Sequence, residues 1–207
     1  MIRGFAIVAL VIVGGCGLGQ RVFDRGAEPE ALSFAGAVCG DPAIKGEVIG
    51  PVPGRIPGCG IEDAVQITSV AGIGLSQASL MDCPTAQALK TWTEQSVKPA
   101  MRPLGRLASY RVAAHYVCKT RNSQPGAKIS EHGKGKAIDI SAFRMQDGTV
   151  VSVQTGWDDR RTRAALREVH GGACGPFGTV LGPDSDSFHQ GHFHLDTASY
   201  RGGPYCK

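Results

Sequence analysis

Six of the seven cysteines, those beyond Cys16, constrain the fold of this chain more than any other feature. Their number is even, and three disulfides among them would staple a domain of about 170 residues. No two of them show the short spacing of roughly two to four residues that cysteine-ligated zinc sites use. Of the possible connectivities we expect the one that joins sequence neighbours, Cys39–Cys59, Cys83–Cys118 and Cys174–Cys206.

The first sixteen residues predict a signal peptide. Arg3 precedes an apolar run over residues 5–13, which is too short to cross a bilayer as a mature helix. The small residues before Cys16 resemble the lipobox of bacterial lipoproteins, which implies cleavage before Cys16 and attachment of lipid to it. The alternative is an ordinary signal peptide that is cut slightly later. We therefore expect an exported, periplasm-facing protein with a lipid anchor in a bacterial membrane.

The remainder of the chain divides into a tether and one domain. Residues 17–34 are polar and lack apolar periodicity, as expected of a flexible linker. Residues 35–207 are numerous enough to bury a core. The net charge of +4 is scattered and forms no basic stripe, so we expect no nucleic-acid partner.

The patterning of the domain predicts an α+β fold. The stretch 36–60 is crowded with Gly and Pro and is expected to be a loop. Apolar residues recur at helical spacing over 84–101, until Pro103 and Gly105 end the pattern. The other expected elements are strands at 65–70, 107–112, 136–144, 149–153 and 192–196, a polar loop at 119–128 and a helix at 158–169. The domain should be a small antiparallel sheet flanked by helices and stapled by disulfides.

Four of the six histidines lie in two short clusters, at residues 130–139 and 189–196. Alternate residues of a strand point to one face, so His192 and His194 should look the same way. By the same rule Asp139 should face a cleft while its neighbours are buried. His132 precedes that strand, where two glycines, Gly133 and Gly135, allow the backbone to bring it round to Asp139.

Two imidazoles and one carboxylate, with a fourth position left for water, are typical of catalytic zinc and not of a closed structural site. The clusters also contain a specific pattern, Ser-x-His-x-x-Gly-x-Ala-x-Asp followed by His-x-His. This pattern resembles the zinc peptidases that include D-Ala-D-Ala carboxypeptidases, lysostaphin-type endopeptidases and the penicillin-insensitive murein endopeptidase. The resemblance implies one Zn²⁺ per chain, held by His132, Asp139 and His194, and a fold of the D-Ala-D-Ala peptidase and hedgehog type.

A longer set of matches extends over nearly the whole domain. It comprises Cys83-Pro84, Ser109-Tyr110-Arg111, Ser130-Glu131-His132, Asp139, Trp157, Ala173-Cys174, Val180-Leu181-Gly182-Pro183 and His192-Phe193-His194-Leu195-Asp196. These segments resemble the bacterial extensin-like C-terminal domain family.

The peptidase resemblance also implies roles for residues around the metal. The carboxypeptidases place a catalytic Glu three residues before the last ligand, where this chain has Gly191. A general base must then come from His192 or His189, since a neutral imidazole can take a proton from water near pH 7. Arg111 resembles an arginine that faces the scissile carbonyl, although a surface or salt-bridged arginine is the alternative. By this resemblance Arg111 is expected to be catalytic, as a cation that stabilises the tetrahedral intermediate, and Arg111 and Ser130 are the expected substrate-binding residues.

Other polar residues of the clusters receive simpler interpretations. His115 and His170 are expected to be structural, and Glu131 is expected to be a solvated neighbour of the site. Asp196 either orients a ligand histidine through its free ring nitrogen or simply ends a strand.

The resemblance implies a zinc-dependent hydrolase of the peptide cross-links of peptidoglycan, similar to a murein endopeptidase. The sequence leaves open whether the bond is D,D or L,D, whether cleavage is endo or exo, and how many chains assemble. The alternative is a zinc-stabilised lipoprotein that binds the cell wall without catalysis, because hedgehog domains resemble the same group and keep a zinc centre as binding modules.

Overall fold

The computed structural model of the chain describes residue 1 and residues 35–199 and 202–207. The predicted signal peptide, the lipidation site Cys16 and the tether at residues 17–34 lie outside the described residues. The chain separates into two units, and the second, Leu32–Lys207, contains the described residues from 35 onward. No described helix combines the length and the apolar character needed to cross a membrane.

The second unit is built on one sheet of ten strands, with the order β1-β2-β3-β4-β5-β6-β9-β8-β10 and with β7 also paired to β6. The strands are β1 (Ala37–Val38), β2 (Asp41–Pro53), β3 (Gly60–Val70), β4 (Ile73–Asp82), β5 (Leu107–Ala114), β6 (Ala137–Met145), β7 (Val150–Ser152), β8 (Thr179–Leu181), β9 (Phe193–Asp196) and β10 (Tyr205–Cys206). The expected strands at 65–70, 107–112, 136–144, 149–153 and 192–196 all fall within or overlap these elements.

The sheet is mixed and larger than the small antiparallel sheet predicted from the sequence. β4 pairs with β5 in parallel, with Gly74 opposite Ser109, because a helical segment crosses over between the two strands. β8 and β10 are also parallel, and the remaining pairs are antiparallel. β4 was not predicted from the sequence, because three consecutive residues of this strand are exposed and its apolar alternation is interrupted.

The predicted helix at 84–101 is present as a nearly continuous helical segment. It consists of α1 (Cys83–Trp92), a π-helical turn (Thr93–Val97), α2 (Lys98–Met101) and a 3₁₀ turn (Arg102–Leu104). The side chain of Asp82 caps its start by accepting a hydrogen bond from the Thr85 N–H at 2.9 Å. Gly105, with a φ of 133°, ends it as expected.

Two shorter helices follow, α3 (Val153–Gly156) and α4 (Arg163–Gly171). The sequence predicted a helix from residue 158, but α4 begins five residues later. The carboxylate of Asp159 accepts a hydrogen bond from the Arg161 N–H at 2.8 Å, and this local turn competes with a helical start.

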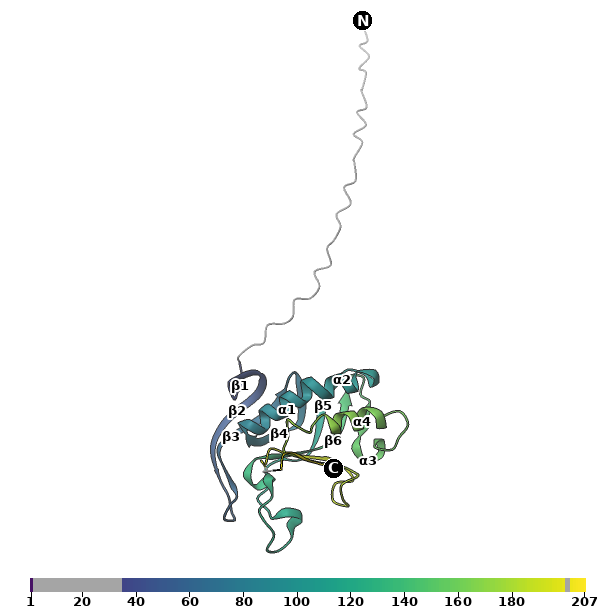
Figure 1. Cartoon of the computed structure of the whole chain (residues 1–207). Helices are drawn as coiled ribbons and strands as arrows, with labels where there is room; N and C mark the ends of the chain where they lie inside the picture. The colour runs from purple at the N-terminus through teal and green to yellow at the C-terminus, as the bar shows by residue number, and fades with distance from the viewer. Residues whose placement is uncertain (2–34, 200–201) are drawn as a thin grey trace. The chain divides into compact units, whose positions relative to one another are not determined.

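The core lies between the helices and one face of the sheet (Figure 1). Trp92 of α1 is fully buried and stacks on Tyr110 of β5, with 5.8 Å between ring centroids. Its indole N–H donates to the carbonyl of Val169 at 2.8 Å and so joins α1 to α4. On β9, Phe193 and Leu195 are also fully buried in this core, which directs His194 to the opposite face.

The expected loop at 36–60 is largely strand. β2 pairs with β3 along most of its length, and three register shifts absorb the irregular Gly and Pro residues. Pro51 and Pro53 lie in the half of β2 that β1 does not reach, where one edge of the strand is open. Proline is tolerated at such an edge, so the high Gly and Pro content of this stretch did not indicate a loop.

Two of the three predicted disulfides are wrong. The bonds are Cys39–Cys83, Cys59–Cys118 and Cys174–Cys206, of which the last alone matches the expectation. Cys39 precedes β2 and Cys59 follows it, and a strand of 13 residues spans roughly 43 Å. Disulfide-bonded Cα atoms lie within about 7 Å of each other, so these sequence neighbours cannot pair.

Candidate metal centre

The candidate centre lies where β6 and β9 pair beside a short helical turn. Asp139 on β6 is directly opposite His194 on β9. His132 comes from a 3₁₀ turn (Glu131–Lys134) just before β6, and Gly135 ends this turn with a φ of 70°. A Cβ atom at Gly135 would overlap the side chain of Ile61, so both the conformation and the space require glycine. The backbone thus turns His132 toward Asp139, as predicted.

Three possible ligand atoms converge at this point. His132 Nε2 lies 3.1 Å from Asp139 Oδ1, and His194 Nδ1 lies 2.9 Å from the same oxygen. The two ring nitrogens are 3.2 Å apart. All three residues are mostly buried, and their ligand atoms lie within 4.8 Å of one another.

The other ring nitrogens of the two histidines are hydrogen-bonded away from this point. His132 Nδ1 lies 2.7 Å from the main-chain oxygen of His115, and His194 Nε2 lies 3.0 Å from Asp196 Oδ2. Both partners accept hydrogen bonds, so each imidazole, when neutral and binding a metal, would carry its N–H on the outside and its lone pair on the inside. This pattern is typical of metal-binding histidines, so the residues present fit a metal ion.

The electrostatics of the cluster also suit a cation. Burial raises the pKa of the Asp139 carboxyl, but hydrogen bonds from His132 and His194 outweigh this effect and hold the pKa well below its usual range. Burial opposes the charge on His194, yet hydrogen bonds to Asp139 and Asp196 raise its pKa to about 9. The two carboxylates therefore stabilise positive charge at His194, and a bound metal would take the place of that proton.

The two further histidines of the second cluster lie beside the converging atoms. His192 Nε2 lies 3.5 Å from Asp139 Oδ2, so His192 and His194 face the same carboxylate, as predicted. Burial lowers the pKa of His192, although Asp139 opposes this effect. His189 lies 5.3 Å from His192 and 5.6 Å from His194, measured between ring centroids. Its Nδ1 lies 2.7 Å from Asp186 Oδ1, which fixes the orientation of the ring.

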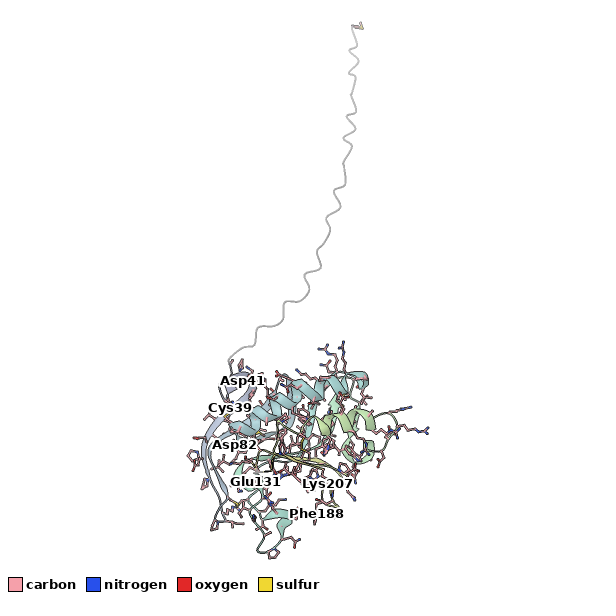
Figure 2. The ribbon with its side chains drawn as sticks, in the orientation of Figure 1. Cys39, Asp41, Asp82, Glu131, Phe188 and Lys207 are labelled. Atoms are coloured by element: carbon pink, nitrogen blue, oxygen red, sulfur yellow. A yellow bond between two sulfur atoms is a disulfide. The ribbon has the colours of Figure 1, made fainter. Side chains whose placement is uncertain are left out.

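A cavity of about 400 Å³ opens over these histidines. Ser130 lines it and is mostly buried, in agreement with its predicted place at the site. Glu131 and Phe188 also line it, and Figure 2 labels both on the side of the sheet away from α1. The cavity wall is therefore apolar at the exposed ring of Phe188 and carries a buried carboxylate at Glu131.

Arg111 does not line this cavity, although the sequence placed it at the site. It is exposed on β5, opposite Ala142, whereas Asp139 is opposite Ala114. Three residues along a strand correspond to about 10 Å. The cations on the cavity wall are Lys119 and Arg121, from the polar loop predicted at 119–128.

Glu131 is buried and not solvated, contrary to the expectation. Its side chain is 7% exposed and its Oε1 atom lies 2.9 Å from Lys134 Nζ and 3.6 Å from Arg121 Nη2. These two cations compensate the buried carboxylate. Glu131 thereby ties the turn that carries His132 to the loop that carries Arg121.

A disulfide packs against the turn that carries His132. Cys118 is bonded to Cys59, and on either side of it two backbone hydrogen bonds join the strand-like segment 117–119 to residues 130–132. A Cβ atom at Gly133 would lie 3.0 Å from the sulfur of Cys59. The turn is thus closely packed against this bond.

The remaining two histidines have structural contacts. The ring of His170 packs against Trp157 and Phe193, with centroid distances of 5.5 and 5.2 Å. His115 Nδ1 accepts a hydrogen bond from the Leu80 N–H at 3.3 Å. The main chain of His115, however, contributes directly to the candidate centre through its bond to His132, which sequence reasoning did not anticipate.

Sequence reasoning also missed Asp186 and Thr179, which line the cavity. Asp186 stands three residues before His189, and this spacing within a turn could have been a signal. The position of Thr179 at the cavity follows only from the pairing of β8 with β9, where Thr179 is opposite Asp196.

The comparisons with known proteins bear on the whole of this domain. A family model described as "Extensin-like protein C-terminus" matches residues 46–207. The chain belongs to this family. The match includes all the residues of the candidate centre, and it confirms the family resemblance seen in the sequence. No curated protein and no solved structure matches the chain.

Proposed function

We propose that this extensin-like domain is a zinc-dependent hydrolase that cleaves the peptide cross-links of peptidoglycan. One observation carries the proposal. The inward-facing nitrogens of His132 and His194 meet a carboxylate oxygen of Asp139 at the floor of a cavity. Two imidazoles and one carboxylate are the donor set of hydrolytic zinc, which keeps a further position for water or substrate.

His132, Asp139 and His194 would hold the metal. When bound, zinc would polarise an amide carbonyl and lower the pKa of water in the cavity. The protein contributes orientation: His115 fixes the ring of His132, and Asp196 fixes the ring of His194. An extended peptide would enter the cavity beside the exposed ring of Phe188.

Proton transfer is assigned to the other two histidines. His189 has its Nδ1 held by Asp186, so Nε2 is the atom that exchanges a proton with the reactants. Within the described part of the chain, the carboxylate nearest to His192 is that of Asp139, at 3.5 Å, and the lowered pKa of His192 keeps a lone pair available near pH 7. Either imidazole can take the proton from water and return it to the leaving amine.

Location and partner are part of the same proposal. A lipid anchor at Cys16 and the tether at 17–34 would hold the domain on the periplasmic face of a membrane, beside peptidoglycan. The peptidase resemblance implies a fold of the D-Ala-D-Ala peptidase and hedgehog type, and it implies murein peptides as substrates. The alternative, a zinc-stabilised protein that binds the wall without catalysis, is favoured by Gly191, which stands where the carboxypeptidases have their catalytic Glu.

The test combines metal analysis with digestion. The purified domain should contain one zinc per chain, and His132→Ala, Asp139→Ala and His194→Ala should each lower this content sharply. Wild-type protein should release smaller muropeptides from purified peptidoglycan, as identified by mass. Unchanged zinc content in all three variants contradicts the proposed centre, whereas zinc with binding but no cleavage supports the alternative.

A further inference from the structure

One side chain beside the candidate centre has an unused hydrogen-bonding group. Thr179 on β8 is 7% exposed, and its hydroxyl is buried without a hydrogen-bond partner among the described residues. Buried polar groups are nearly always paired, because an unpaired one is unfavourable to the folded state. Because Thr179 also lines the cavity over the candidate centre, a ligand bound there would supply the missing partner.

The strand pairing places this hydroxyl next to the metal ligands. Thr179 is opposite Asp196 on β9 and opposite Tyr205 on β10. Two residues further along β8, Leu181 is opposite His194, which is in turn opposite Asp139. Residues that pair across strands share a face of the sheet, so these side chains form two parallel rows on the face of the centre.

A second cavity, of about 500 Å³, adjoins the cavity over the candidate centre along these rows. Arg121, Thr179 and Leu181 line both cavities, so the two spaces meet at β8. The far wall of the second cavity is Pro204 and Tyr205, and the ring of Tyr205 is exposed. The Cys174–Cys206 disulfide fastens this wall next to Tyr205.

The lining defines the chemistry of an occupant. Leu181, Pro204 and Tyr205 offer an apolar surface, whereas Thr179 offers a hydroxyl that can donate to a carbonyl or accept from an N–H. A peptide supplies both parts, an amide for the hydroxyl and a side chain for the apolar wall. The alanine residues of a peptidoglycan stem peptide fit this description.

We propose that the cavity over β8 and β10 is a peptide subsite, in which Thr179 bonds a substrate amide and Tyr205 packs on the adjacent apolar side chain. This inference rests on the proposed function. The subsite adds a direction to the proposed function, because the substrate would then extend from the metal toward the C-terminal strand β10.

The test uses Thr179→Val and Tyr205→Ser in the full mature protein loaded with zinc. Valine has nearly the shape of threonine and removes only the hydroxyl, which has no partner to lose, so zinc content and Tm should not fall. The KM for a cross-linked muropeptide dimer should rise about fivefold to tenfold in each variant, with a smaller change in kcat. The matched control is Thr68→Val, on β3, whose hydroxyl bonds to the Lys45 carbonyl at 3.2 Å, and its KM should be unchanged.

Binding of the same dimer, measured by calorimetry, separates failure of the subsite from failure of the function. Wild-type cleavage with unaltered KM in either variant overturns the subsite and leaves the hydrolase. If wild type binds without cleaving, and both variants bind more weakly, the subsite stands and the hydrolase fails. If wild type neither cleaves nor binds the dimer, both proposals are overturned.

Discussion

His194 and Asp196, two residues apart on β9, are joined by a 3.0 Å contact between Nε2 and Oδ2 on the face of the sheet that carries the candidate centre. Asp196 is 3% exposed, and its other oxygen accepts a hydrogen bond from the Ala198 N–H at 3.0 Å. The carboxylate is thus fixed at both oxygens. It determines which nitrogen of His194 is left for a metal.

The first prediction concerns this contact. Asp196→Asn should lower the affinity for zinc by about 10-fold to 100-fold, because the amide no longer orients and polarises the imidazole as the carboxylate does. Competition against a chromogenic chelator measures the effect. Asp184→Asn is the matched control, since Asp184 bonds Trp157 and Arg167 away from the centre, and it should bind zinc as wild type does. Equal affinities in the two variants would contradict the role of Asp196.

The second prediction separates proton transfer from metal binding. His192→Ala should retain zinc and fold while lowering cleavage of cross-linked murein by roughly 10²-fold to 10⁴-fold, as expected for loss of an acid–base group. His189→Ala should do the same if His189 is the base, and Asp186→Asn should then reduce the rate less, because it only releases the ring. Loss of zinc from His192→Ala would instead make His192 a ligand.

The third prediction concerns pH. Burial lowers the pKa of His170 below its ordinary value of 6.5, although Asp184 opposes this effect. The unfolded chain therefore binds a proton more readily, so the stabilising contribution is present above about pH 6.5 and is lost as the pH falls below it. Metal-free His170→Gln should show a smaller loss of unfolding free energy between pH 7 and 5 than wild type, as measured in urea. An identical pH profile in both proteins would refute this assignment.

The fourth prediction tests the anchor. Cys16→Ala should move the protein from the membrane fraction to the soluble envelope fraction, or should block its processing, because the sulfur that carries the lipid is absent. Fractionation and gel mobility report the change. Unaltered membrane association and mobility would support an ordinary signal peptide.

The sequence predicted the centre better than it predicted the scaffold. Strand periodicity was sufficient to place Asp139 and His194 on one face, and the glycines were sufficient to predict the turn of His132. These are local properties of the chain. Arg111 lies outside the cavity, and its distance from Asp139 depends on register shifts between β5 and β6, which local pattern does not contain.

Long-range relationships account for the other errors. The cysteine pairs depend on the length of β2, and β2 was not recognised because Pro51 and Pro53 are tolerated only on an open edge. Thr179 acquires its place at the site from pairing with two strands that come after it in the sequence. In each case the decisive information is which segments lie side by side.

The bond between Cys59 and Cys118 has a consequence for how the protein matures. It packs against Gly133, next to His132, and it fastens the segment whose His115 carbonyl orients that ligand. Before these thiols are oxidised, the turn that carries His132 lacks this support. Metal uptake should therefore follow oxidation in time, and chains produced under reducing conditions should emerge as apoprotein even when zinc is abundant.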